Sequence, residues 1–183
     1  RRDAIACWLV LQWGFAMRAV ILALTAMGLS ACATTNSGPG PNGPAWTEIE
    51  ISEGMCYGRC PVYLIRVTPD DRYQLTGVFF TRHDGETSGT LDAGSFQRLA
   101  AVLQAHDAAF LPADITRYNP VTCGSSFASD MPSFRLSLTD ANGRQDILWH
   151  PGCAESPYRD ALTQIRAGVR EAYDYETLIA PKR

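Results

Sequence analysis

The sequence predicts an α+β fold in which an antiparallel meander sheet carries two helices packed on one face, in the order β-β-β-β-α-β-β-α. Short segments alternate polar and apolar residues with a period of two, which is typical of half-buried strands. Two longer segments repeat apolar residues at a spacing of 3.6, which is typical of amphipathic helices. Because each helix follows a run of strands, packing the helices on one face of the sheet would bury both apolar surfaces.

Four strands are predicted before the first helix. The alternating segments cover residues 47–51, 62–67, 72–80 and 86–91. Pro69-Asp70-Asp71 would join the second and third strands as a hairpin, and a polar turn around Gly85 would lead into the fourth. The aromatic residues of this region are expected in the sheet core and in cross-strand pairs; they are Tyr57, Tyr63, Tyr73, Phe79 and Phe80.

Two helices and a second hairpin complete the predicted domain. Asp92 can cap a helix over residues 93–106. A long loop over residues 111–132 separates this helix from strands at 133–139 and 144–150. Ser156 as a cap and Pro157 at the first position suit the start of the last helix. Its predicted apolar face consists of Tyr158, Leu162, Ile165, Val169 and Ala172.

Residues 17–31 resemble the signal peptide of a bacterial lipoprotein. Met17 is followed by a basic residue and by an apolar run that is too short to span a bilayer, which needs ~20 residues. Leu29-Ser30-Ala31-Cys32 resembles the lipobox, which implies cleavage before Cys32 and acylation of its sulfur. Ala33 at the next position favours the outer membrane, by resemblance to the sorting rule of Gram-negative cells.

The rest of the N-terminal region is interpreted around this signal. Residues 1–16 are interpreted as an over-long N-terminal extension, so that Met17 is the true start. A single transmembrane helix over residues 4–31 is the alternative, with one arginine costing ~2.5–3.5 kcal/mol at the membrane centre. Residues 32–45 would supply the lipidated cysteine and a flexible Gly/Pro linker, and residues 46–183 a single domain. The membrane is then a partner through the lipid anchor, with the domain facing the periplasm.

Four cysteines fall in the predicted domain, an even number that is usually paired in an exported protein. Of the three possible pairings we favour Cys56–Cys60 with Cys123–Cys153. In the chain-entropy model these bonds would contribute ~2 and ~3.5 kcal/mol. Because the cysteines are expected to be paired, neither a metal nor another cofactor is predicted.

A short motif carries a family resemblance. The stretch from Cys56 to Tyr63 reads C-Y-G-x-C-P-x-Y and resembles a bacterial family known as domain of unknown function 6438, whose members are often lipoproteins or other exported proteins. The resemblance runs over most of residues 46–175 and includes Tyr118 and Asp130-Met131-Pro132. It implies the fold but no activity, and Cys123 and Cys153 are additions to its pattern.

No pattern in the sequence predicts an enzyme. The net charge of −3 disfavours a nucleic-acid partner, and neither a G-x-S-x-G nor an H-E-x-x-H motif is present. We therefore predict an envelope module that binds a protein, a glycan or a small ligand through loops containing Tyr57, Arg59, Tyr118 and Asp130. The alternative is a periplasmic thiol-disulfide oxidoreductase that uses Cys56 and Cys60, with Arg59 lowering a thiol pKa.

Overall fold

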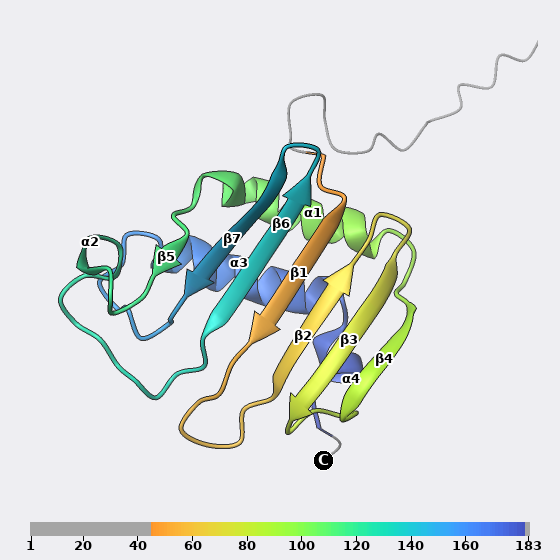
Figure 1. Cartoon of the computed structure of the whole chain (residues 1–183), viewed down its shortest axis with the longest axis horizontal. Coiled ribbons are helices and arrows are strands. Elements are labelled where there is room, and N and C mark those ends of the chain that lie inside the picture. The colour runs from red at the N-terminus through yellow and green to blue at the C-terminus, as the bar shows by residue number, and fades with distance from the viewer. Residues whose placement is uncertain (1–44, 182–183) are drawn as a thin grey trace, which may run out of the picture. The chain divides into compact units, whose positions relative to one another are not determined.

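A computed structural model of the chain describes residues 45–181, which form a mixed α+β domain (Figure 1). The predicted signal peptide, Cys32 and nearly all of the predicted linker lie outside these residues. The described part contains one seven-stranded sheet, in the order β4-β3-β2-β1-β6-β7-β5. The strands are β1 Glu48–Glu53, β2 Val62–Val67, β3 Arg72–Phe79, β4 Gly85–Thr90, β5 Asp114–Ile115, β6 Phe134–Asp140 and β7 Gly143–Trp149.

The predicted antiparallel meander is wrong in two respects. β1 lies in the middle of the sheet, paired antiparallel with both β2 and β6, so the chain does not pass from each strand to its neighbour. The two-residue strand β5 pairs with β7 in parallel, which makes the sheet mixed. Polar–apolar alternation shows which side chains of a strand are buried, but it does not show which strands are neighbours in the sheet. The strand β5 has two residues and is too short to show an alternating pattern.

The described residues contain four α-helices and a short 3₁₀ helix instead of two helices. They are α1 Ser95–Ala105, the 3₁₀ helix Ala108–Phe110, α2 Pro120–Cys123, α3 Arg159–Ala172 and α4 Tyr175–Leu178. The long helices α1 and α3 contact one another, whereas α2 contacts β5 at the edge of the sheet (Figure 1). The prediction of two helices packed on one face of the sheet is therefore confirmed only as a mixed α+β arrangement.

The cap of α1 comes from a distant residue. Asp92 was the predicted cap, but the carboxylate of Asp71 accepts hydrogen bonds from the backbone N–H groups of Gly94 and Phe96, at 2.7 and 2.8 Å. Gly94 adopts a left-handed conformation with φ of 80°, so it starts the helix without a side-chain cap of its own. The turn between β2 and β3 thus fixes where α1 begins.

One face of the sheet and the apolar sides of α1 and α3 form a continuous core. The strands contribute Ile49, Ile51, Tyr63, Ile65, Val67, Leu75, Phe134, Leu136, Leu138, Ile147 and Trp149. The helices contribute Phe96, Leu99, Leu103, Leu162, Ile165 and Val169. A Cβ atom on Gly168 would lie 2.8 Å from the Val102 side chain, so glycine allows the two long helices to pack closely. The predicted apolar face of the last helix is confirmed, apart from Tyr158, which is half-buried.

A buried carboxylate lies at one end of this core. Glu53, at the end of β1, is 3% exposed and forms ion pairs with Arg166 and Arg170 of α3. The Tyr63 hydroxyl donates to the Glu53 carboxylate at 3.0 Å and lies 2.6 Å from the hydroxyl of Tyr173. Burial raises the pKa of Glu53, but the hydrogen bonds and charges of the two arginines outweigh it and lower the pKa below its ordinary value.

We expect Glu53→Gln to lower the free energy of unfolding by about 3 kcal/mol near neutral pH, because two partly buried arginines lose their counter-charge. The folded pKa lies below the ordinary value of 4.5, so this stabilisation is present above that pH and is lost as the pH falls through the folded pKa. Urea unfolding at about pH 7 and about pH 3 measures both effects, and the gap between variant and wild type should shrink in acid.

Glu50→Gln is the matched control for this prediction. Glu50 is also buried, but its partners Arg66 and Arg144 keep 43% and 40% of their side-chain surface exposed and can regain hydration. The control should therefore lose only about 1 kcal/mol. Equal losses in the two variants would contradict the special role of Glu53.

Candidate functional site

The motif loop, residues 54–61, joins β1 to β2 and is closed by the Cys56–Cys60 disulfide. The N–H of Gly58 donates to the carbonyl of Cys56 at 2.9 Å, with a φ of 152° that side-chain-bearing residues rarely adopt. Both cysteines are half-buried, whereas Tyr57 between them is 92% exposed. The small disulfide ring therefore holds an aromatic side chain out in solvent.

The long loop between β5 and β6 is fixed by the second disulfide. Cys123, the last residue of α2, is bonded to Cys153, and both are fully buried. Phe127 forms an isolated β-bridge with Cys153, and the N–H of Ala128 donates a hydrogen bond to the carbonyl of Gly152 at 3.0 Å. The loop is thus attached to the segment that follows β7, and the two disulfides are the pairing favoured from the sequence.

Most of the predicted contact residues meet at one end of the sheet. The N–H of Tyr57 donates to the carbonyl of Asp130 at 3.2 Å, so the motif loop lies against the long loop. Arg59, in the same motif loop, lies over the ring of Phe80 at 5.4 Å. Tyr118 is placed elsewhere, beside β5, where its ring contacts Arg117 at 4.7 Å. The structure therefore brings three of the four predicted residues together and separates the fourth.

Large apolar side chains are exposed at this end of the domain. We call them the apolar loop patch, which consists of Met55, Tyr57, Val78, Phe79, Phe80 and Met131. They come from the motif loop, the end of β3 and the long loop, which lie at the lower end of the sheet in Figure 1. Exposed apolar clusters of this kind mark interaction sites in soluble domains.

Phe79 and Phe80 are exposed, although the sequence predicts that they are buried, because they lie at the end of an alternating strand. The β2–β3 register shifts between Val62 and Tyr63, so Phe79 leaves the alternation that buries Leu75. Phe80 follows with a positive φ of 55°. The prediction that both lie in the core is wrong, and so is the prediction for Tyr57. A one-residue shift in pairing leaves no signal in a single sequence.

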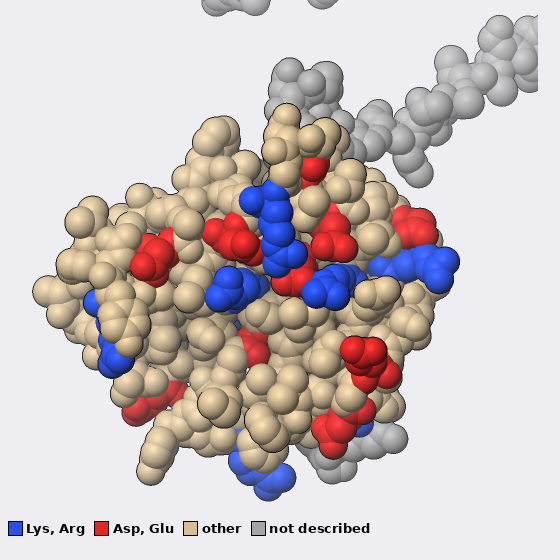
Figure 2. Space-filling model, viewed as in Figure 1, with Lys and Arg blue, Asp and Glu red and all other residues tan. Residues whose placement is uncertain are grey.

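The second face of the sheet is polar and carries a network of charges (Figure 2). Glu50 on β1 accepts hydrogen bonds from Arg66 on β2 at 2.6 Å and from Arg144 on β7 at 2.7 Å. Burial raises the pKa of Glu50, but the hydrogen bonds and charges of the two arginines outweigh burial and lower it. Arg144 also pairs with Asp146 at 3.1 Å. These charges neutralise one another, which suits a structural role better than acid–base chemistry.

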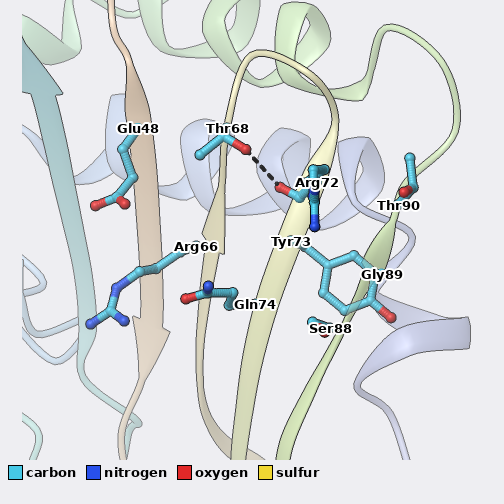
Figure 3. Close-up of a pocket in the computed structure, with 9 residues that line it drawn as sticks. All are labelled: Glu48, Arg66, Thr68, Arg72, Tyr73, Gln74, Ser88, Gly89 and Thr90. Atoms are coloured by element: carbon cyan, nitrogen blue, oxygen red, sulfur yellow. Dashed lines mark hydrogen bonds between the residues drawn. The ribbon is translucent and has the colours of Figure 1, made fainter.

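A groove of about 410 Å³ runs over β2, β3 and β4 on the same face (Figure 3). The ring of Tyr73 lies over Gly89 on the neighbouring strand, and a Cβ atom there would be 2.8 Å from the ring. Arg66 points away from the groove towards β1, where it binds Glu50. The other charged residues of the lining are the half-buried Glu48 and the exposed Arg72, and neither takes part in an ion pair within residues 45–181.

Residues 45–181 contain neither a cluster of metal ligands nor a helix that could span a membrane. No group of three or more His, Cys, Asp or Glu side chains in this range could hold a metal ion. No helix in the same range is long and apolar enough to cross a membrane.

The sequence profile of a protein family described as Domain of unknown function (DUF6438) matches residues 47–173. The chain belongs to this family. A comparison with curated proteins finds no match. The DUF6438 match extends from the start of β1 to the end of α3, so it includes both disulfides, the apolar loop patch and Tyr118. The resemblance recognised in the sequence is thereby confirmed, and α4 lies beyond it.

The two disulfides of this DUF6438 domain should differ in both stabilisation and accessibility. Replacing Cys123 and Cys153 with alanine should cost ~3.5 kcal/mol, against ~2 kcal/mol for Cys56 and Cys60, because the larger loop restricts the unfolded chain more. Dithiothreitol should open Cys56–Cys60 first, since its sulfurs belong to half-buried residues and those of Cys123–Cys153 to fully buried ones. Timed alkylation with mass spectrometry gives the order of opening, and a reversed order would contradict this assignment.

Proposed function

We propose that this protein is exported, lipidated at Cys32 and held at the outer membrane, where its DUF6438 domain faces the periplasm as a non-enzymatic binding module. The apolar loop patch is the observation that carries the binding role. Six large apolar side chains on loops and at the end of a strand are costly to leave in water unless a partner covers them at least part of the time. The disulfides suit the oxidising compartment that this location implies.

The direction in which the chain enters the domain supports a protein partner. Trp46 is buried and leads directly into β1, whose far end continues into the motif loop (Figure 1). The apolar loop patch therefore lies at the opposite end of β1 from the tether. A Gly/Pro linker over residues 33–45 would have an end-to-end distance of ~20 Å. A flexible tether of this length would let the domain turn, so that the apolar loop patch could reach a partner in the periplasm.

The chemistry of the apolar loop patch describes the partner it fits. Tyrosine and arginine are among the residues that most often dominate the binding energy of an interface, and Tyr57 and Arg59 are both exposed in the motif loop. Arg59 is absent from the ion pairs formed by residues 45–181. The expected partner is a protein surface with an apolar pocket for Tyr57 and a carboxylate facing Arg59.

Thiol–disulfide exchange through Cys56 and Cys60 is the alternative function. Both residues are half-buried in a surface loop, so the bond is within reach of another thiol. A midpoint near about −200 mV in a glutathione titration of the full chain would favour exchange. Resistance to the glutathione pool would favour a structural brace for the motif loop.

Lipid anchoring predicts a specific effect of Cys32→Ala. Without the cysteine the lipoprotein peptidase has no substrate, so the precursor should accumulate and the acyl chains should be missing by mass spectrometry. Thr35→Ala is the matched control, because it changes a residue just beyond the predicted lipobox and should leave processing unchanged. Membrane-bound Cys32→Ala protein that is processed like wild type would contradict the anchor.

Binding through the apolar loop patch predicts position-dependent cross-linking in intact cells. A photo-reactive phenylalanine analogue at Tyr57 should give a discrete adduct with an envelope protein. The same analogue at Phe110, which is 85% exposed in the 3₁₀ helix outside the apolar loop patch, should not. Adding Phe80→Ser should weaken the adduct formed at position 57. Equal adducts at both positions, or none at either, would contradict this role.

A further inference from the structure

A cavity of about 600 Å³ lies between β5, the end of β7 and the long loop, and its lining shares no residue with the apolar loop patch. Its apolar lining includes Leu148 and Phe127, and the rings of Phe127 and His150 lie 4.5 Å apart between centroids. Tyr118, the predicted contact residue that the structure separates from Tyr57, also lines it. The size is that of a small-molecule site, and three aromatic rings give it flat surfaces for a planar ligand.

The cavity has an excess of positive charge. Arg117 and Arg135 line it, and Asp114 is the one acidic residue among its lining side chains. Neither arginine takes part in an ion pair within residues 45–181. The guanidinium of Arg117 donates to the hydroxyl of Tyr118 at 2.5 Å and lies over the rings of Tyr118 and Phe127. An arginine placed in this way is available to an anionic group on a stacked ligand.

The histidine and the serines of the lining can also donate hydrogen bonds to an anion. Burial and the nearby charge of Arg117 lower the pKa of His150, so the ring is neutral near pH 7. Its Nδ1 accepts a hydrogen bond from the Gly152 N–H at 3.1 Å, and the proton of the neutral ring therefore resides on Nε2. The hydroxyls of Ser129 and Ser133 line the same cavity. The lining is thus rich in donors.

The Cys123–Cys153 disulfide gives this cavity a fixed wall. Cys123 lies between Tyr118 and Phe127 in the chain, and both of these rings belong to the lining. Its partner Cys153 forms the β-bridge with Phe127 just beyond His150. The loop is therefore held in place before a ligand arrives, which reduces the entropy lost on binding.

We propose that this cavity binds a small planar aromatic anion, with its ring against Phe127, Tyr118 and Leu148 and its anionic group against Arg117 and Arg135. The lining of this cavity shares no residue with the apolar loop patch, so ligand binding here does not depend on the proposed protein binding. It also assigns a role to Cys123–Cys153, which the motif does not include: the bond shapes a ligand site.

The test is calorimetric titration of the full chain in a mild detergent with 2-naphthoate, a planar aromatic carboxylate that fits the volume. We expect saturable one-to-one binding, weakened by about tenfold or more in Arg135→Gln and in Arg117→Gln. Arg135 is an exposed residue of β6 without an ion pair, so its variant should retain the wild-type thermal unfolding curve. Arg159→Gln, which changes an exposed arginine on α3, is the matched control and should bind like wild type.

Two companion probes separate charge from shape. The neutral 2-naphthalenemethanol and the non-aromatic cyclohexanecarboxylate should each bind about tenfold more weakly than 2-naphthoate. The Cys123→Ala/Cys153→Ala chain, where it remains folded, should bind 2-naphthoate more weakly as well. The proposal is overturned by absence of saturable binding, by equal affinity for the neutral probe, or by affinity that is the same in Arg135→Gln, Arg117→Gln and wild type.

Discussion

The ion pairs of Glu53 join the central strand of the sheet to its longest helix. The carboxylate lies at the end of β1 on the core side, and its partners Arg166 and Arg170 lie one turn apart on α3. A buried carboxylate needs hydrogen-bond donors from the protein in place of water. This requirement restricts α3 to the rotation and the axial position that bring both guanidinium groups to the Glu53 carboxylate. Tyr63 and Tyr173 extend the network to β2 and to the end of α3.

The end of β1 also positions the candidate binding surface. Glu53 is the last residue of the strand, and the motif loop begins at the next residue. Because Glu53 is held in the core, the loop leaves the sheet from a fixed point, and Cys56–Cys60 then limits how far it extends. The backbone contact between Tyr57 and Asp130 joins it to the long loop. A rigid scaffold that presents short braced loops is the usual construction of a binding domain.

The two disulfides support two different surfaces. Cys56–Cys60 closes the motif loop, which supplies Met55 and Tyr57 to the apolar loop patch. Cys123–Cys153 holds the long loop beside β5, where the aromatic, positively charged cavity lies. The first surface suits a protein because it is apolar and projects outward. The second suits a small anion because it is concave and contains two arginines outside any ion pair of the described residues. A single small domain can therefore present two recognition sites, with the long loop contributing Met131 to the first and Phe127 to the second.

The sequence by itself determined the family, the helical segments at α1 and α3 and the alternating strands, because these depend on local periodicity or on a short motif. It left three disulfide pairings open, and the structure contains the one that we favoured. Only the tertiary structure decided that β1 lies between β2 and β6, that Asp71 caps α1, and that Phe79 and Phe80 face solvent. It also placed Tyr118 in a cavity with Arg117 and Arg135, away from Tyr57. The physical reason is the same in each case: strand neighbours, register shifts and contacts between loops are set by packing between segments far apart in the chain, and such contacts leave no periodic trace in a single sequence.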